Sequence, residues 1–183
     1  LLLLNKWDQE EEVSILMDNR EHVFRLHHHK NLRGDNMAIT TNAITNSFKE
    51  EILEGVHDFT PTTGDVFKLA LYTSQASIGA DTTAYPGDSS GNQVPDSGQY
   101  AQGGGALVNA LVSTQGTVAF VDFSDLSFTG VTLTARGALI YNTSNSNKSV
   151  CVLDFGSDKT ATSGTFTIQF PNPNNTQAII RIA

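Results

Sequence analysis

Residues 131–142 (VTLTARGALIYN) and 149–156 (SVCVLDFG) decide the fold class of this 183-residue chain. Both stretches are rich in β-branched and small apolar residues, which favour extended strands. The residues from Asn142 to Lys148 between them are mostly Asn, Ser and Thr, which are turn formers. The pattern predicts two antiparallel strands joined by a hairpin loop.

Similar short segments flank this pair. Residues 65–74 (DVFKLALYTS) alternate apolar and polar side chains, and residues 117–124, 164–171 and 178–183 are again β-rich and nearly uncharged. We expect residues 158–164, which are mostly Thr, Ser and Gly, to be a connection. Short strands at such intervals predict a mainly β fold, an antiparallel β-sandwich of the jelly-roll or immunoglobulin-like type.

One helix is expected before the strands, over residues 45–57. Its apolar stripe should pack on the sheet through Phe48, Ile52 and Val56, with Pro61 ending the segment. The stripe also includes Ile44 and Leu53, and the residues expected on the solvent side are Lys49, Glu50, Glu51 and Glu54. Ser47 and Glu50 fit a capping box. His57, near the C-terminal end, is expected to be structural because no nucleophile motif accompanies it.

Composition excludes several functional classes. The net charge of −8 argues against a nucleic-acid surface, which requires clustered Lys and Arg. The single Cys151 cannot form a disulfide within the chain. No apolar run approaches the ~20 residues of a membrane-spanning helix. We therefore expect neither nucleic acid nor membrane as a partner.

Composition changes near Met37. Residues 1–36 contain four of the five His and the only Trp, and we treat them as an N-terminal arm before a β-sandwich domain over residues 37–183. The run Arg33-Gly34-Asp35-Asn36 can be encoded by codons that hold a purine-rich ribosome-binding sequence. One expectation is therefore that the arm is an upstream translation artefact and that Met37 is the natural start. The alternative is a genuine charged arm.

Three motifs invite a functional interpretation that their context does not support. Consecutive His27, His28 and His29 cannot easily converge on one metal ion, and Arg33-Gly34-Asp35 is a tripeptide that recurs by chance. The Gly-rich run 103–105 lacks the following helix and Lys of a phosphate-binding loop, so it predicts a bulge or close backbone packing.

The long polar connection 75–99 is the expected place for a recognition surface.

The available acid–base groups are scattered. Asp122, Asp125, Asp154 and Asp158 lie at strand ends and turns, where Asp stabilises loops. Arg136 is a lone cation in an apolar strand, and burial would require a carboxylate partner such as Asp154 or Asp122. We expect no catalytic residue, no cofactor site and no metal site, and hence no enzyme.

The strand series resembles a group of small virion structural proteins of tailed bacteriophages. The resemblance covers nearly everything after Met37, and its most specific part is the order TARGALIYN, VLDFG and FTIQFP. It implies a tail-associated or capsid-decorating component of the virion, with no active-site residues to carry over.

We therefore expect a non-enzymatic virion protein that binds other virion subunits and forms a homo-oligomer. The alternative is a host-surface or glycan-binding module of a tail fibre, for which Tyr72, Tyr85 and Tyr100 are the candidate aromatic platform. A hydrolase acting on the host envelope would need two convergent carboxylates or a metal site.

Overall fold

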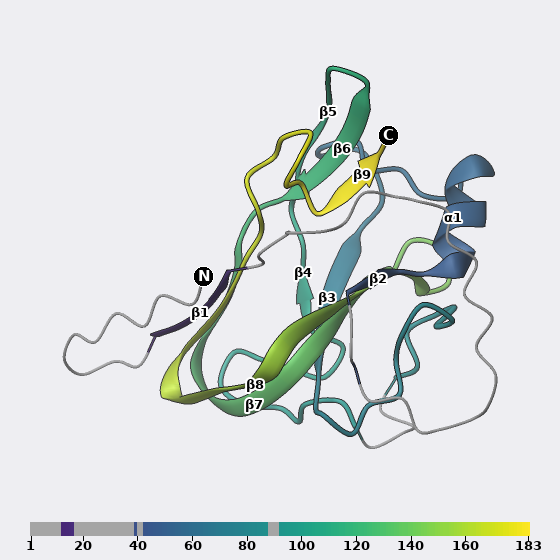
Figure 1. Cartoon of the computed structure of the whole chain (residues 1–183). Helices are drawn as coiled ribbons and strands as arrows, with labels where there is room; N and C mark the ends of the chain where they lie inside the picture. The colour runs from purple at the N-terminus through teal and green to yellow at the C-terminus, as the bar shows by residue number, and fades with distance from the viewer. Residues whose placement is uncertain (1–11, 17–38, 40–41, 88–91) are drawn as a thin grey trace.

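The structure of the chain is a computed structural model that describes residues 12–16, 39, 42–87 and 92–183. Nine strands and one short helix lie in this part of the chain, and the strands form two sheets (Figure 1). The mainly β fold with one N-terminal helix, expected from the sequence, is confirmed.

The larger sheet has six strands in the order β1-β8-β7-β3-β4, with β2 also pairing with β8. Its strands are β1 (Glu12–Leu16), β2 (Ala43–Ile44), β3 (Phe67–Tyr72), β4 (Gly105–Ala106), β7 (Leu126–Asn142) and β8 (Lys148–Gln169). The pairing is antiparallel except between β1 and β8, which run parallel. The predicted strands at 65–74, 131–142 and 149–156 are confirmed.

The predicted connection at 158–164 is wrong, because β8 continues through it to Gln169. The polar composition of this segment reflects solvent exposure rather than a turn. The paired strand β7 supplies hydrogen-bond partners along it, and Thr134 and Thr160 share a 2.8 Å hydrogen bond between their hydroxyls. Gly156 and Ser163 have positive φ angles of 74° and 51°, and irregular pairing lets the two long strands bend together (Figure 1).

The smaller sheet has the order β5-β6-β9, with β5 (Asn109–Gln115), β6 (Val118–Phe123) and β9 (Ile180–Ile182), all antiparallel. The strands expected at 117–124 and 178–183 are confirmed, whereas β5 was not expected. The residue that could have indicated β5 is Gly116, which takes a positive φ of 63° in the turn between β5 and β6. The resulting β5–β6 hairpin projects from the rest of the molecule (Figure 1).

One apolar core contains side chains from both sheets. Phe67 of β3 stacks on Phe59 with ring centroids 4.5 Å apart and lies 5.8 Å from Phe123 of β6. A second cluster, including Ile39, Tyr72 and Leu139, covers the opposite face of the larger sheet. Both faces of β3 are therefore buried, as its second-face residue Ala70 suggested.

Helix α1 covers Asn46–Leu53 and is shorter than expected. Gly55, with a φ of +72°, ends it. Its N–H donates to the Ile52 carbonyl at 3.3 Å, and the Val56 N–H donates to the Glu51 carbonyl at 2.9 Å. These two bonds form a Schellman motif, so the expectation that Pro61 ends the segment is wrong.

The faces of α1 also differ in part from expectation. Phe48 is buried and Ile52 is partly buried against the core, as predicted, and Val56 beyond the helix end is partly exposed. Leu53, however, is 89% exposed, and Glu51 is buried. The predicted capping box does not form, because Thr45 is the N-cap residue and has no side-chain cap hydrogen bond.

Candidate functional site

A buried polar cluster joins α1, the segment after it and the β7–β8 hairpin. The His57 ring lies between Glu51, whose Oε2 is 2.9 Å from Nε2, and Asn142, whose Nδ2 is 2.9 Å from Nδ1. Asn142 also donates to Asp65 Oδ2 at 2.7 Å, and Lys148 Nζ donates to Glu51 Oε1 at 2.5 Å. Residues up to 97 positions apart in sequence therefore share one hydrogen-bond network.

The network fixes which ring nitrogen of His57 carries the proton. The Asn142 amide is oriented by its donation to Asp65 and by the Ser144 N–H, which donates to Oδ1 at 3.0 Å. Its NH₂ group therefore faces His57 Nδ1, which must accept, and Nε2–H donates to Glu51. Both ring nitrogens are occupied and the side chain has no solvent exposure, so His57 has no nitrogen left for a substrate. The expected structural role of His57 follows.

Within the network, the charged forms of Glu51 and Lys148 stabilise each other. Burial works to raise the pKa of Glu51, but the hydrogen bonds from Lys148 and His57 outweigh it, and the pKa lies below its ordinary value. The hydrogen bond to Glu51 raises the pKa of Lys148. Asn145 completes the cluster by donating to Asp65 Oδ2 at 2.9 Å and to the Val56 carbonyl at 2.8 Å. The segment after α1 is thereby held against the hairpin loop.

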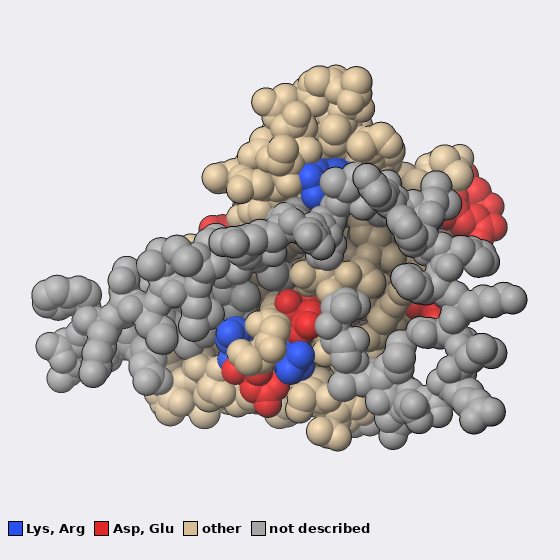
Figure 2. Space-filling view, viewed as in Figure 1, with Lys and Arg blue, Asp and Glu red and all other residues tan. Residues whose placement is uncertain are grey.

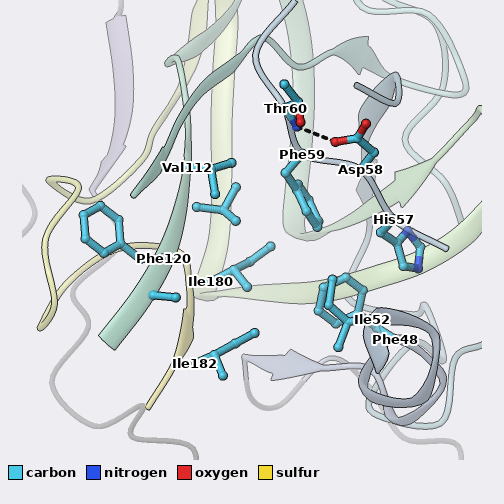
Figure 3. Close-up of a pocket in the computed structure, with 12 residues that line it drawn as sticks. Phe48, Ile52, His57, Asp58, Phe59, Thr60, Val112, Phe120, Ile180 and Ile182 are labelled. Atoms are coloured by element: carbon cyan, nitrogen blue, oxygen red, sulfur yellow. Dashed lines mark hydrogen bonds between the residues drawn. The ribbon is translucent and has the colours of Figure 1, made fainter. Parts of the chain in front are cut away.

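An apolar hollow of about 240 Å³ lies on the other side of this segment, between α1 and the smaller sheet (Figure 3). One wall is built by Phe48, Ile52 and the 57–60 segment, in which the Thr60 N–H donates to Asp58 Oδ1 at 2.9 Å. The opposite wall is built by side chains of β5, β6 and β9, including Val112, Val121, Ile180 and Ile182. The polar cluster therefore positions one wall of the hollow, and the small sheet forms the other.

Large apolar side chains are exposed beside the hollow. Val112 is 49% exposed and Ile182 54% exposed, and both belong to its lining. Leu53 is on the helix that forms the facing wall. Figure 2 shows the projecting β5–β6 end largely without charged residues, whereas acidic residues gather over α1. Two large apolar side chains of the lining, Val112 and Ile182, are thus open to solvent, and a contact with another molecule would cover them.

Two of the carboxylates considered from the sequence, Asp125 and Asp154, have hydrogen-bond partners of their own. Asp154 Oδ1 accepts from Arg136 Nε at 3.1 Å, which confirms the expected ion pair. Asp125 accepts from the Phe170 N–H at 2.9 Å, and Asp158 is exposed. Burial, and to a lesser extent the charge of Asp125, raises the pKa of Asp122.

The Gly-rich run and the aromatic candidates have structural roles. A Cβ on Gly104 would lie 1.7 Å from the Leu69 carbonyl oxygen, so the predicted close backbone packing is confirmed. Tyr72 and Tyr100 are buried, and Tyr85 stacks on Tyr141 with ring centroids 4.4 Å apart. The three tyrosines therefore do not form an exposed platform.

The long connection 75–99, where we expected a recognition surface, packs on the core in several places. Its buried residues include Ala76, Ile78 and Val94, and the Val94 N–H donates to the Leu71 carbonyl of β3 at 3.0 Å. Within its described part the connection therefore acts as a cover for the sheet. The hollow beside β5, β6 and β9 was not anticipated, because its opposite walls come from segments that lie far apart in sequence, such as the 57–60 segment and Val112.

The His27–His29 and Arg33–Asp35 motifs and the boundary at Met37 lie outside the described residues. Among the described residues, no group of three or more His, Cys, Asp or Glu is placed to hold a metal ion. No helix in this part of the chain has the length and apolar character needed to cross a membrane.

Comparisons with protein-family models, with curated proteins and with solved structures found no match.

Proposed function

We propose that this protein is a non-enzymatic structural subunit of a tailed-bacteriophage virion, tail-associated or capsid-decorating, that assembles through the apolar surface beside β5, β6 and β9. The observation that carries the proposal is the apolar hollow with Val112 and Ile182 exposed at its rim. The resemblance of the strand series to small virion proteins supports the same assignment. Its place of action is then the virion.

The two sheets would form the layers of a β-sandwich of the jelly-roll or immunoglobulin-like type. The shared core supports this, because it combines side chains of β3, β7 and β8 with those of β6 and β9. In such an arrangement the β5–β6 hairpin extends beyond the core, and its apolar residues there have no partner layer from the larger sheet.

The occupant of this surface is a second copy of the chain. A protein of net charge −8 repels its own copies over most faces, but the lining of the hollow contains a single charged residue, Asp58. Two copies therefore meet there with little like-charge repulsion. A symmetric contact also uses the same patch twice, which suits a surface with few charges.

The test is the oligomeric state of two matched variants. Val112→Glu places a charge in the proposed contact, and Val66→Glu makes the same change at a residue of nearly equal exposure, 51%, that does not line the hollow. Both positions are exposed, so each variant should fold. We expect sedimentation equilibrium to show a defined oligomer for the unaltered protein and for Val66→Glu, and a weakened one for Val112→Glu. Equal association of both variants would contradict the proposed surface.

A further inference from the structure

Strand β5 forms an open edge of the smaller sheet. It pairs with β6 on one side, and no strand of the described part of the chain pairs with its other side, since the sheet order is β5-β6-β9. Leu111 and Val112 are 37% and 49% exposed, and Thr114 and Gln115 are exposed as well. The strand belongs to the hairpin that projects from the rest of the molecule (Figure 1). Such an edge offers backbone N–H and C=O groups to another strand.

The outward backbone groups of β5 belong to Val112 and Thr114. The turn to β6 has two residues, because Gln115 pairs directly with Val118. The pair that flanks a two-residue turn exchanges backbone hydrogen bonds, and along an antiparallel ladder such pairs alternate with pairs that exchange none. Residues 112 and 114 belong to the second kind of pair, so their N–H and C=O groups point away from β6.

β5 lacks the features that protect the other described sheet edges from pairing. Natural edge strands are protected by shortness, by charge or by Pro. β2 and β4 have two residues each, β9 has three and includes Arg181, and β1 begins with Glu12. β5 has seven residues, and the whole stretch 106–121 contains neither a charged residue nor Pro. Its edge is therefore both long and uncharged.

We propose that β5 of one copy pairs antiparallel with β5 of a second copy, so that two small sheets join edge to edge into one continuous sheet. The inference rests on the proposed assembly function, and it names the backbone contact through which copies join. A second copy suits this edge because a chain of net charge −8 meets itself here over an uncharged stretch. Val112 lies both on the edge and in the lining of the hollow, so strand pairing continues the apolar contact.

Two-fold symmetry sets the register of this pairing. When Ser113 lies opposite its own counterpart, residues 111–115 face themselves over their full length. Val112 of each copy then exchanges both backbone hydrogen bonds with Thr114 of the other, so all outward groups of the two residues are used. Ser113 forms a pair that exchanges no hydrogen bond, with Cα atoms ~4.5 Å apart.

The test is a disulfide between identical copies of the full chain. Ser113→Cys places two thiols opposite each other, at a Cα separation that suits a disulfide. Thr117→Cys is the matched control, because Thr117 is exposed in the turn of the same hairpin and pairing centred on Ser113 holds it far from its counterpart. The native Cys151 is buried and is common to both variants. Non-reducing electrophoresis and peptide mapping after mild oxidation measure the linked dimer.

A second pair of substitutions, made in the Ser113→Cys chain, separates edge pairing from the apolar contact. Thr114→Pro removes an outward N–H, whereas Thr114→Val keeps it. Thr114 is exposed and is not among the residues that line the hollow, so both variants leave the lining intact. Circular dichroism verifies the fold of Thr114→Pro, and if this variant does not fold, the two cysteine variants decide alone.

We expect several-fold more covalent dimer from Ser113→Cys than from Thr117→Cys, and we expect Thr114→Pro but not Thr114→Val to remove this excess. Equal yields from the two cysteine variants, or an excess that survives in a folded Thr114→Pro variant, would overturn edge pairing. Sedimentation equilibrium of the unaltered protein separates the two proposals. Association without the link at position 113 refutes edge pairing alone, whereas monomers at all concentrations refute the proposed assembly function as well.

Discussion

Replacing Phe48 by Ala tests how α1 is joined to the rest of the protein. Phe48 is 3% exposed, and its ring lies 5.0 Å from the His57 ring and 6.0 Å, edge-on, from Phe59. It belongs to the core cluster and also lines the hollow. The substitution therefore removes a buried aromatic side chain at the junction of the core, the polar cluster and the contact surface.

Truncation of a buried Phe to Ala costs about 3–5 kcal/mol of unfolding free energy. Because the space left by Phe48 joins a hollow that already exists, solvent or neighbouring side chains can enter it, and we expect a value near the lower end, about 3 kcal/mol. For a domain of this size such a loss lowers the melting temperature by ~6–12 °C.

Urea denaturation followed by far-ultraviolet circular dichroism measures the change directly, as a shifted midpoint at constant slope. Leu53→Ala is the matched control, because Leu53 lies on the same helix and is 89% exposed, and we expect its effect to stay within about 0.5 kcal/mol. A cost below about 1 kcal/mol for Phe48→Ala, or equal costs for both variants, would refute the packing described for α1.

Three further predictions follow from the fold. A variant beginning at Met37 should melt cooperatively within a few degrees of the full chain, because the described core clusters are built by side chains from Ile39 onward; loss of cooperative unfolding would contradict this. Burial raises the pKa of the Cys151 thiol from about 9 to about 12. Between these two pH values the thiol is ionised in the unfolded chain but not in the folded one, so the free energy of unfolding should fall as pH rises from 9 toward 12. The expected loss is up to about 1.4 kcal/mol per pH unit. Cys151→Ala should lack this part of the alkaline loss, and an unchanged slope in denaturation midpoints would count against it. Gly104→Ala should lower the free energy of unfolding by at least ~3 kcal/mol, since its Cβ would overlap the Leu69 carbonyl. Gly87 also has a positive φ, +65°, but open space around it, so Gly87→Ala should cost only about 1 kcal/mol in the same denaturation assay.

The strands were predictable where apolar alternation and turn residues agree. The β7–β8 hairpin follows from the β-branched run at 131–142, the Asn- and Ser-rich turn and the run at 149–156. The continuation of β8 through 158–164 was missed because Thr, Ser and Gly there resemble a loop, and only the opposite strand β7 makes them part of the sheet. Local composition does not report such a partner.

The candidate site was predictable only in part. The burial of Phe48 follows from the helical stripe. Glu51, in contrast, was placed on the solvent side, because the partners that allow its burial are not visible in the local sequence. Lys148 lies 97 residues away, and His57 is folded back after the helix end. The hollow likewise depends on how α1 faces a sheet assembled from residues 109–123 and 180–182. Contacts between distant segments decide both features, and no short motif encodes them.

The central claim is that this chain is a structural subunit of a virion, and quantitative mass spectrometry of purified particles of the encoding phage tests it most directly. The account predicts peptides from β3, β7 and β8 in a fixed, stoichiometric ratio to the known structural subunits. Absence of these peptides from particles would contradict it, and so would turnover of a cell-wall or capsule substrate that is lost on Asp122→Asn or Asp154→Asn.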